Sequence, residues 1–565
     1  MQASQDRKTG REDTLRWLQS SRQDEQPGLE LLPAAPALST TKNSFLLRLE
    51  SSGDTATGKD GAERAAARSK PCKDPDGTAH SAIIITTPSD SSSNDGSSPV
   101  SIYDVLSRKR KYAIIYISAV AAILAPLSTT MYLPALRPIQ ADLHTTIELV
   151  VSSVAIYMFV IGAGALLWGP LSDWLGRRTA FLAATLLFLA TSIPCIFAPS
   201  IYLLIVFRAL QGLAVAAYGS VGSGLAADIF APCERGTALG ISSVPPLVGP
   251  VIGPLLGGVL SDHFGWRSTF IFTTCMAGVV ILPLLLFFLP ETTQYRALRR
   301  LRATDPQTAA VIKEADSIEA SPPRFRAPWY PVLLILDRQL ILHVALGLVA
   351  FGSYYCSVTE LPINLGSPAY GLSPSKVGLC YLPIGVAGML ACPLGGKVSD
   401  ICGRVNPSQP LRKVLPSNAM LLFVFPPCLL LYGWSLHFHM HIAVPLIGIF
   451  LVTLATCSYL PGIFSYMTAV KQQTAGAAAA GLYALLFLAS GVLMLVAASV
   501  IEAVGIGPFS TILAGLNVIV ASVACVQIRR GIATGPVEQQ QQQQQQQRQP
   551  PATAGGGSLC RIMKC

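Results

Sequence analysis

About twelve apolar segments, each near the roughly 20 residues that a membrane-spanning helix needs, set the main constraint on how this chain folds. Hydrophobic residues make up 51% of the 565 residues, and charged residues make up only 13%, against about 25% in a typical soluble protein. We therefore predict an all-α polytopic membrane protein with twelve transmembrane helices. The predicted helices lie at 112–134, 148–168, 179–198, 202–226, 237–260, 268–290, 339–361, 376–396, 414–436, 441–466, 475–501 and 507–528.

Polar stretches divide these helices into two pseudo-symmetric six-helix bundles. The stretch between the bundles is charged and closed by prolines, which is typical of a linker. The first hundred or so residues are too polar to bury enough apolar surface to order themselves, and the last part carries a low-complexity run of glutamines. We predict a disordered cytosolic tail at 1–111, a first bundle at 112–290, a cytosolic linker at 291–338, a second bundle at 339–528 and a low-complexity cytosolic tail at 529–565.

Basic residues gather on one side of the predicted topology. If both termini face the cytosol, 22 Lys and Arg fall on the cytosolic side once the distal tails are left out, and three fall opposite: Arg137, Arg267 and Lys376. Cytosolic loops of membrane proteins carry such an excess. We predict a multi-pass protein with cytosolic termini, in the plasma membrane or alternatively the vacuolar membrane. The net charge of +10 forms no basic stripe beside aromatic residues, so no nucleic-acid partner is expected.

One short charged turn occurs twice in the sequence. GPLSDWLGRR at 169–178 and GKVSDICGRV at 396–405 fall in equivalent loops of the two halves. Duplicated halves around a central site are common in secondary transporters. Because Asp can accept hydrogen bonds from Arg of a neighbouring element, we predict a cytosolic gate; alternatively, the arginines are only anchors at the membrane surface. The gate residues are Gly169, Asp173, Gly176, Arg177, Arg178, Asp400 and Arg404.

The first turn resembles the loop 2–3 signature of the major facilitator superfamily. Trp174 departs from that pattern, because the family usually has a basic residue after the aspartate. A second segment, FRALQGLAVAAYGSVGSGLAADIF at 207–230, resembles the family's helix 4 signature Arg-x-x-Gln-Gly. The resemblance implies a role in proton coupling for Arg208, with Gln211 on the same helix face. The alternative is that Arg208 bonds carbonyls of helix 1 and only holds the helices together.

Helix 5 carries GPVIGPLLGG, which resembles the signature of proton-coupled antiporters within the superfamily. Its small residues permit close helix approach, and its prolines bend the helix. The antiporter residues are Gly249, Pro250, Gly253, Pro254, Gly257 and Gly258. The flanking segments STTMYLPALRPIQADL, FGWRSTFIF and FLPET resemble fungal twelve-helix drug:proton antiporters, nearest the quinidine and dityrosine exporter branch. GLYALLFLASG at 481–491 lacks the arginine that some members of the branch have there.

Few charged or titratable residues fall within the predicted spans. Glu360 could contact a cationic substrate or carry a proton, or it could be solvated at the membrane interface. Tyr132, Tyr218, Tyr354 and Tyr355 could line an amphipathic cavity, although tyrosine is also common in interface belts. We expect His343 at the interface, and Asp228 to cap a helix end or be solvated. The cysteines form no CxxC pair, and HFHMH at 437–441 falls in an outer loop, so no metal site is expected.

Together these features predict a secondary active transporter, not an enzyme, that exports a drug, toxic compound or secreted secondary metabolite by alternating access. The alternatives are an exporter of an organic acid or glycolipid made by a biosynthetic cluster, and a nutrient importer or sensor on the same fold. The chain has no G-x-x-x-x-G-K-[ST] loop for a nucleotide, so we expect a proton gradient and no cofactor. The expected partners of this monomer are protons, a small-molecule substrate and the lipid bilayer.

Overall fold

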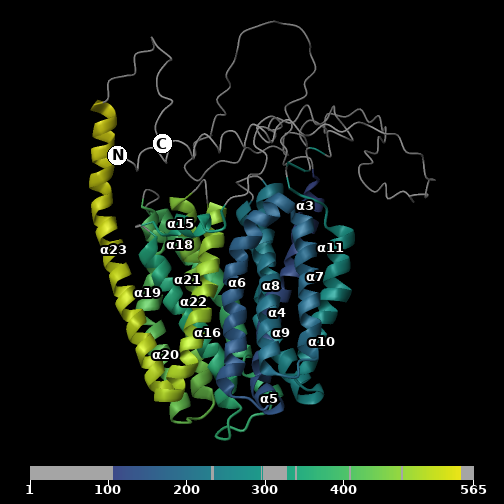
Figure 1. The fold of residues 1–565 in the computed structure, drawn as a ribbon. Coiled ribbons are helices and arrows are strands. Elements are labelled where there is room, and N and C mark those ends of the chain that lie inside the picture. Colours follow the sequence, from purple (N-terminus) through teal and green to yellow (C-terminus); the bar gives the residue numbers. More distant parts are fainter. Residues whose placement is uncertain are drawn as a thin grey trace, which may run out of the picture. The chain divides into compact units, whose positions relative to one another are not determined.

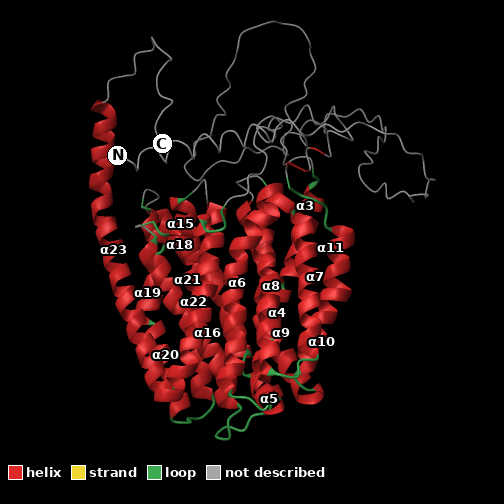
Figure 2. Cartoon of the chain, viewed as in Figure 1, coloured by secondary structure: helices red, strands yellow, loops and turns green. Residues whose placement is uncertain are grey.

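The computed structural model describes residues 106–230, 235–293, 295–296, 299, 327–337, 340–405, 409–471 and 475–548. Most of the predicted N-terminal tail and linker, and the end of the C-terminal tail, lie outside these residues. All described helices belong to one unit, Pro88–Cys565. Within the described ranges every regular element is a helix (Figure 2).

The first bundle begins with a broken helix. α3 (Arg108–Ala122) and α4 (Leu124–Thr130) are followed by η2 (Leu133–Ala135) and α5 (Leu136–Asp142). Pro126 and Pro134 account for the breaks, because proline lacks the backbone N–H and clashes with the carbonyl four residues earlier. The other elements are α6 (Ile147–Leu175), α7 (Arg177–Ile196), α8 (Ile201–Ile229), α9 (Arg235–Phe264), α10 (Arg267–Cys275), η3 (Met276–Ile281) and α11 (Leu282–Phe288).

The second bundle begins after the short helix α15 (Tyr330–Ile335). Its ninth-span helix is broken like the first span, because Pro427 follows the junction between α19 (Leu415–Phe423) and α20 (Phe425–His437). The other elements are α16 (Ile341–Leu365), α17 (Pro374–Leu379), α18 (Leu382–Val405), η4 (Pro410–Lys413), α21 (Ala443–Val470), α22 (Ala475–Val504) and α23 (Ile506–Arg548).

The helices account for the predicted membrane spans. Among the described residues, 11 stretches are long and apolar enough to cross a membrane, and they match the predicted spans other than 237–260. That remaining span falls on α9, which has 30 residues. The prediction of an all-α membrane protein is confirmed, and the 11 stretches together with α9 agree with the predicted twelve transmembrane helices in two bundles. α23 is longer than expected, since it continues past residue 528 to Arg548.

The two bundles pack against each other through helices that carry glycines. α6 packs along α22, where a Cβ on Gly162 would lie 2.5 Å from the Ala484 carbonyl oxygen. α9 packs against α17 and α18 of the other bundle. We call the end of the bundles where α3 begins the tail end, and the opposite end, where α5 and α20 finish, the far end. The tail end is uppermost in Figure 1.

Candidate functional site

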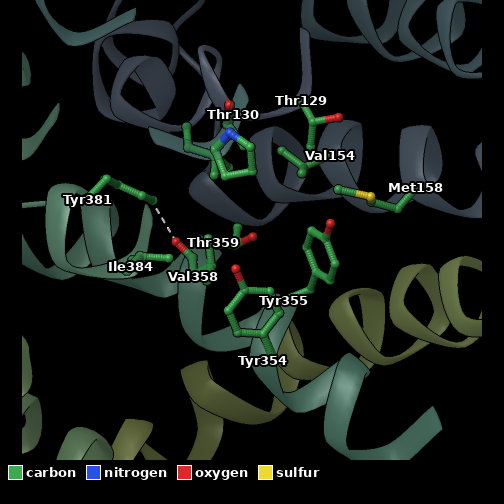
Figure 3. Close-up of a pocket in the computed structure, with 12 residues that line it drawn as sticks. Thr129, Thr130, Val154, Met158, Tyr354, Tyr355, Val358, Thr359, Tyr381 and Ile384 are labelled. Carbon is green, nitrogen blue, oxygen red and sulfur yellow. Dashed lines mark hydrogen bonds between the residues drawn. The ribbon is translucent and has the colours of Figure 1, made fainter. Parts of the chain in front are cut away.

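A pocket lies between the two bundles. Helices α4, α6 and α9 form one wall, and α16 and the start of α18 form the other (Figure 3). The cavity itself has a volume of about 20 Å³, and all the space not filled by atoms, including the open space at its mouth, is about 390 Å³. Its lining residues are Thr129, Thr130, Leu133, Val154, Met158, Pro250, Tyr354, Tyr355, Val358, Thr359, Tyr381 and Ile384. None of these described lining residues is charged, so the pocket suits an uncharged or amphipathic group.

Hydroxyl groups supply the polar part of the pocket wall. Figure 3 shows the hydroxyls of Tyr354 and Tyr355 pointing from α16 toward the first bundle. Other hydroxyls are already engaged: Tyr381 donates to the Val358 carbonyl at 2.7 Å, and Thr130 donates to the Pro126 carbonyl at 2.8 Å. The two tyrosines of α16, together with Thr359 of the same helix, are therefore the polar groups best placed to meet a bound molecule.

The sequence-predicted cavity residues are placed in different parts of the structure. Tyr354 lines the pocket, whereas Tyr132, Tyr218 and Glu360 are buried outside its lining. Tyr218 forms a hydrogen bond of 2.9 Å with Thr185 inside the first bundle. Sequence reasoning did not single out the threonines of α4, although they stand in the STT segment that carries the family resemblance.

Arg208 lies fully buried inside the first bundle. Its guanidinium carbon is 3.8 Å from the centroid of the Tyr157 ring and 4.6 Å from that of Tyr132. Its Nη1 donates to Gln211 Oε1 at 2.7 Å, and Gln211 Nε2 donates to Ser192 Oγ at 2.7 Å. The structure thus brings together the two residues predicted from the i, i+3 spacing of the helix 4 signature.

The charge of Arg208 has little compensation among the described residues. Its bonds to Ser128 on α4 are long, 3.4 Å to the carbonyl oxygen and 3.5 Å to Oγ. Its Nε and Nη2 have no hydrogen-bond partner in the described part of the chain. The Tyr157 hydroxyl accepts a hydrogen bond of 3.4 Å from Thr129. Since Thr129 lines the pocket, Tyr157 connects the pocket wall to the buried cation.

The first repeated turn forms an ion-pair network at the tail end. Arg177 contacts Asp173 at 2.6 Å and Asp228 of α8 at 2.9 Å. Its backbone N–H donates to Glu291 Oε1 at 3.0 Å. Gly176 has φ of +92°, which a side chain rarely adopts. Burial raises the pKa of the Asp228 carboxyl, and the Arg177 guanidinium opposes this shift.

Asp228 and Glu291 are thus network members that sequence reasoning missed. We expected Asp228 to cap a helix or be solvated, and the structure places it in a largely buried ion pair. The two carboxylates are 51 and 114 residues from Arg177, and no local pattern connects them to it. The FLPET segment, which contains Glu291, was the one available signal. Gly169 faces open space, and Arg178 donates to the Leu286 carbonyl.

The second copy of the motif is not the loop that we predicted, because residues 396–405 form the last part of α18, whereas the first copy bends at Gly176 between α6 and α7. Asp400 and Arg404 are exposed, and neither forms an ion pair with another described residue. Ser399 instead donates to the Lys413 carbonyl at 2.8 Å, and Gly403 packs against the Lys413 side chain. The repeat therefore has the same sequence pattern in both halves, but among the described residues only its first copy forms a closed ion-pair network.

The glycines of α9 lie against two different neighbours. Gly249 faces Pro126, where an added Cβ would lie 2.7 Å from Cγ, and Gly253 and Gly257 face Thr130 and Met131 of the same broken helix. Gly258 instead faces Pro374 of α17 in the second bundle.

The prolines of α9 also contact the pocket and the second bundle: Pro250 lines the pocket, and the Pro254 carbonyl contacts Gly378. This helix therefore connects the pocket with the seam between the bundles.

His343 is a further difference from expectation. We expected it at the membrane interface, but it is fully buried at the start of α16. Its Nδ1 lies 3.2 Å from Asn418 Nδ2 on α19, and its ring meets Tyr466 edge to face. These neighbours come from other helices of the second bundle, which explains why the local sequence did not reveal the burial.

Comparison with known proteins agrees with the fold and with the predicted family. A model of the Major Facilitator Superfamily matches residues 118–495. Citrate exporter 1 of Aspergillus niger is 27% identical over 401 residues, which cover 65% of this chain and 75% of that protein. The MFS antiporter QDR3 of Candida albicans is 38% identical over 188 residues, which cover 33% of this chain and 26% of that protein.

A solved structure shares the fold. The xylose transporter XylE of E. coli, in a partially occluded inward open conformation, aligns with a TM-score of 0.56 and 15% sequence identity. The alignment covers 73% of this chain and 96% of that transporter. With a family model spanning most of the helices, and relatives of the same kind along both bundles, the chain belongs to the major facilitator superfamily.

Proposed function

We propose that this protein is a proton-coupled exporter of a small molecule that works by alternating access, with its tail end in the cytosol. Secondary transport is the activity of its family and of relatives whose names describe exporters, antiporters and efflux pumps. The excess of Lys and Arg near the tail end supports this orientation. A plasma-membrane location and a monomeric state complete the proposal.

The contacts between the bundles support a conformation closed at the far end. Arg137 of α5 donates to the Ile363 carbonyl of α16 at 3.2 and 3.1 Å, and the Ser375 N–H donates to Asp262 at 3.4 Å. Towards the tail end, a Cβ on Gly169, Gly219 or Gly222 would meet no atom within 4 Å. With the tail end in the cytosol, this arrangement is inward-facing.

The buried charge of Arg208 is the observation that carries the proposal of proton coupling. Arginine is not deprotonated in proteins, so the charge is permanent, and burying an unpaired charge costs several kcal/mol. A neutral side chain would therefore hold the helices at lower cost. Two unit charges about 8 Å apart interact by about 2 kcal/mol at an effective dielectric constant near 20. Because Arg208 is permanently charged and lies beside the pocket, the energy of the transporter depends on the net charge of what the pocket holds.

One proton provides enough energy for useful export. A unit charge moving through 100 mV releases about 2.3 kcal/mol. Because about 1.4 kcal/mol corresponds to a factor of ten in concentration, one proton per cycle sustains a gradient of about fifty-fold.

The pocket favours an amphipathic substrate with uncharged parts. Apolar side chains and tyrosine and threonine hydroxyls form its wall. An organic acid is the second candidate, because two nitrogens of Arg208 have no partner among the described residues and the relative from A. niger is named for citrate. A carboxylate would reach these nitrogens only if the rings of Tyr132 and Tyr157 moved aside.

Transport by purified protein in sealed vesicles tests the proposal. Quinidine and citrate serve as probes, and a pH-sensitive dye reports proton movement. We expect a pH gradient to drive at least one probe against its concentration gradient. Arg208→Ala should abolish this drive, Arg208→Lys should keep part of it because the charge remains, and Arg412→Ala should behave like the native protein. If Arg208→Ala retained full proton-driven transport, the coupling role would be wrong.

A further inference from the structure

One cation connects the two bundles at the far end. Arg137, at the start of α5, donates through Nε and Nη2 to the Ile363 carbonyl of α16, and through Nη1 to Gln140 at 3.3 Å. Its aliphatic part also packs beside Gly366, since an added Cβ there would lie 3.3 Å from Arg137 Cγ. Both hydrogen bonds between the bundles are accepted by the Ile363 backbone oxygen. This contact between α5 and α16 therefore uses no side chain of α16 as an acceptor.

A buried carboxylate lies one helical turn from that carbonyl. Glu360 of α16 is only 8% exposed, and its carboxylate accepts one hydrogen bond, of 3.4 Å, from Asn364 Nδ2. The positive charge of Arg137 acts on this carboxylate, yet no ion pair within 4 Å joins these two described residues. The guanidinium group of Arg137 instead donates its hydrogen bonds to the Ile363 carbonyl and the Gln140 side chain.

None of the other titratable neighbours of Glu360 donates a hydrogen bond to it in the described part of the chain. They are Cys356 on the same helix, Tyr381 between α17 and α18, and Tyr432 on α20. The Tyr381 hydroxyl donates to the Val358 carbonyl at 2.7 Å, and the Tyr432 hydroxyl donates to the Ser357 carbonyl at 2.6 Å. An ionised carboxylate in this position would be buried with one weak donor, which is costly. The closed far end therefore fits a neutral Glu360.

We propose that Glu360 is a proton-binding site on the second bundle, and that its protonation favours closure of the far end. When the proton leaves, the new charge draws Arg137 off the Ile363 carbonyl or draws water in between the bundles. Either change loosens the contact between α5 and α16. Protonation restores the neutral carboxyl and lets Arg137 return to the carbonyl.

Protonation of Glu360 would set the direction of the transport cycle. This part of the proposal rests on the proposed function, because it assumes exchange of protons for substrate. A proton arriving from the far side closes the far end, and its release toward the tail side lets the far end open again. Val358 and Thr359, the residues just before Glu360, line the pocket. The carboxyl therefore lies beside the space through which the proton would leave.

The closure itself can be measured without transport. Hydrogen–deuterium exchange of the full chain in lipid nanodiscs, corrected for the intrinsic pH dependence of exchange, reports opening of α5 and of the loop after α16. In the native protein we expect at least fivefold slower exchange at these segments at pH 5.5 than at pH 7.5. Glu360→Gln, a neutral mimic, should give the slow rate at both pH values. Glu502→Gln, which changes an exposed carboxylate of α22, should keep the native pH response.

Transport provides the second measurement. Glu360→Gln should lose transport driven by a pH gradient but keep exchange of labelled for unlabelled probe, which needs no net proton movement; kept exchange also shows that the variant is folded. A native protein without any proton-driven transport would contradict the proposed function while leaving the exchange measurement intact. The Glu360 proposal is overturned if far-end exchange in the native protein does not depend on pH, or if Glu360→Gln keeps the native pH dependence.

Discussion

Adding side-chain volume at Gly378 should open the far end. This glycine of α17 lies against the Pro254 carbonyl of α9, and reciprocally Gly258 of α9 lies against the Pro374 carbonyl. A Cβ on Gly378 would overlap the Pro254 carbonyl oxygen and lie 3.2 Å from its carbon. The obstacle is backbone, so neither helix can yield by a rotamer change, and overpacking of this kind costs about 1–3 kcal/mol.

This cost applies only while the two bundles are in contact at the far end. The gain in helix propensity on replacing glycine applies to both conformations, so it does not shift the balance between them. Gly378→Ala should therefore lower the population of the far-end-closed state relative to that of the open state by about 5–150-fold. Gly378→Val should lower it further, because its two methyl groups meet the same backbone.

Distances between spin labels at the far end, measured on purified protein in nanodiscs, report this population. Ala141 and Ala369, which are exposed on the first and second bundle, are suitable label sites once the native cysteines are replaced. Gly515→Ala is the matched control, because a Cβ there would meet no atom within 4 Å. An unchanged distance distribution in Gly378→Val would refute the argument that close backbone contact between α9 and α17 holds the far end shut.

Further variants test the tail end and the pocket by thermal unfolding. Asp228→Asn removes the charge of a largely buried partner of Arg177 and should lower the free energy of unfolding by about 1–3 kcal/mol. This is less than the loss expected for a fully buried pair, because Asp173 still pairs with Arg177. An unchanged Tm would show that the network is not stabilising. Asp400→Asn, at the equivalent turn, should stay within about 0.5 kcal/mol, because that residue is exposed, and a larger loss would contradict the asymmetry. Tyr381→Phe should cost about 0.5–1.5 kcal/mol, the usual contribution of one hydrogen bond, and a loss well above this range would mean that the hydroxyl makes further bonds.

The membrane helices could be predicted from the sequence because their signal is local. A run of apolar residues long enough to cross a bilayer has few alternative structures. The pairing of Arg208 with Gln211 is local as well, since residues three apart share a helix face. The aromatic rings around Arg208 were not predictable, because Tyr132 and Tyr157 come from the first two spans of the bundle.

The repeated turn shows where sequence reasoning stops. Its two copies have the same pattern of Gly, Ser, Asp and Arg, which suggested one gate with two equivalent halves. The structure gives the Arg177 side chain two carboxylate partners and its backbone N–H a third, whereas Arg404 is exposed. The difference comes from Asp228 on α8 and Glu291 after α11, and contacts across such separations are set by packing of whole helices.

The central claim is that the two bundles expose one shared pocket to each side in turn. Its most direct test is to measure spin-label distances at both ends under one set of conditions, with Ala141 and Ala369 at the far end and Trp174 and Val405, which are also exposed, at the tail end. As pH is varied in the presence of a transported probe, we expect one distance to lengthen while the other shortens. Distances that change together, or that do not change, would contradict the claim.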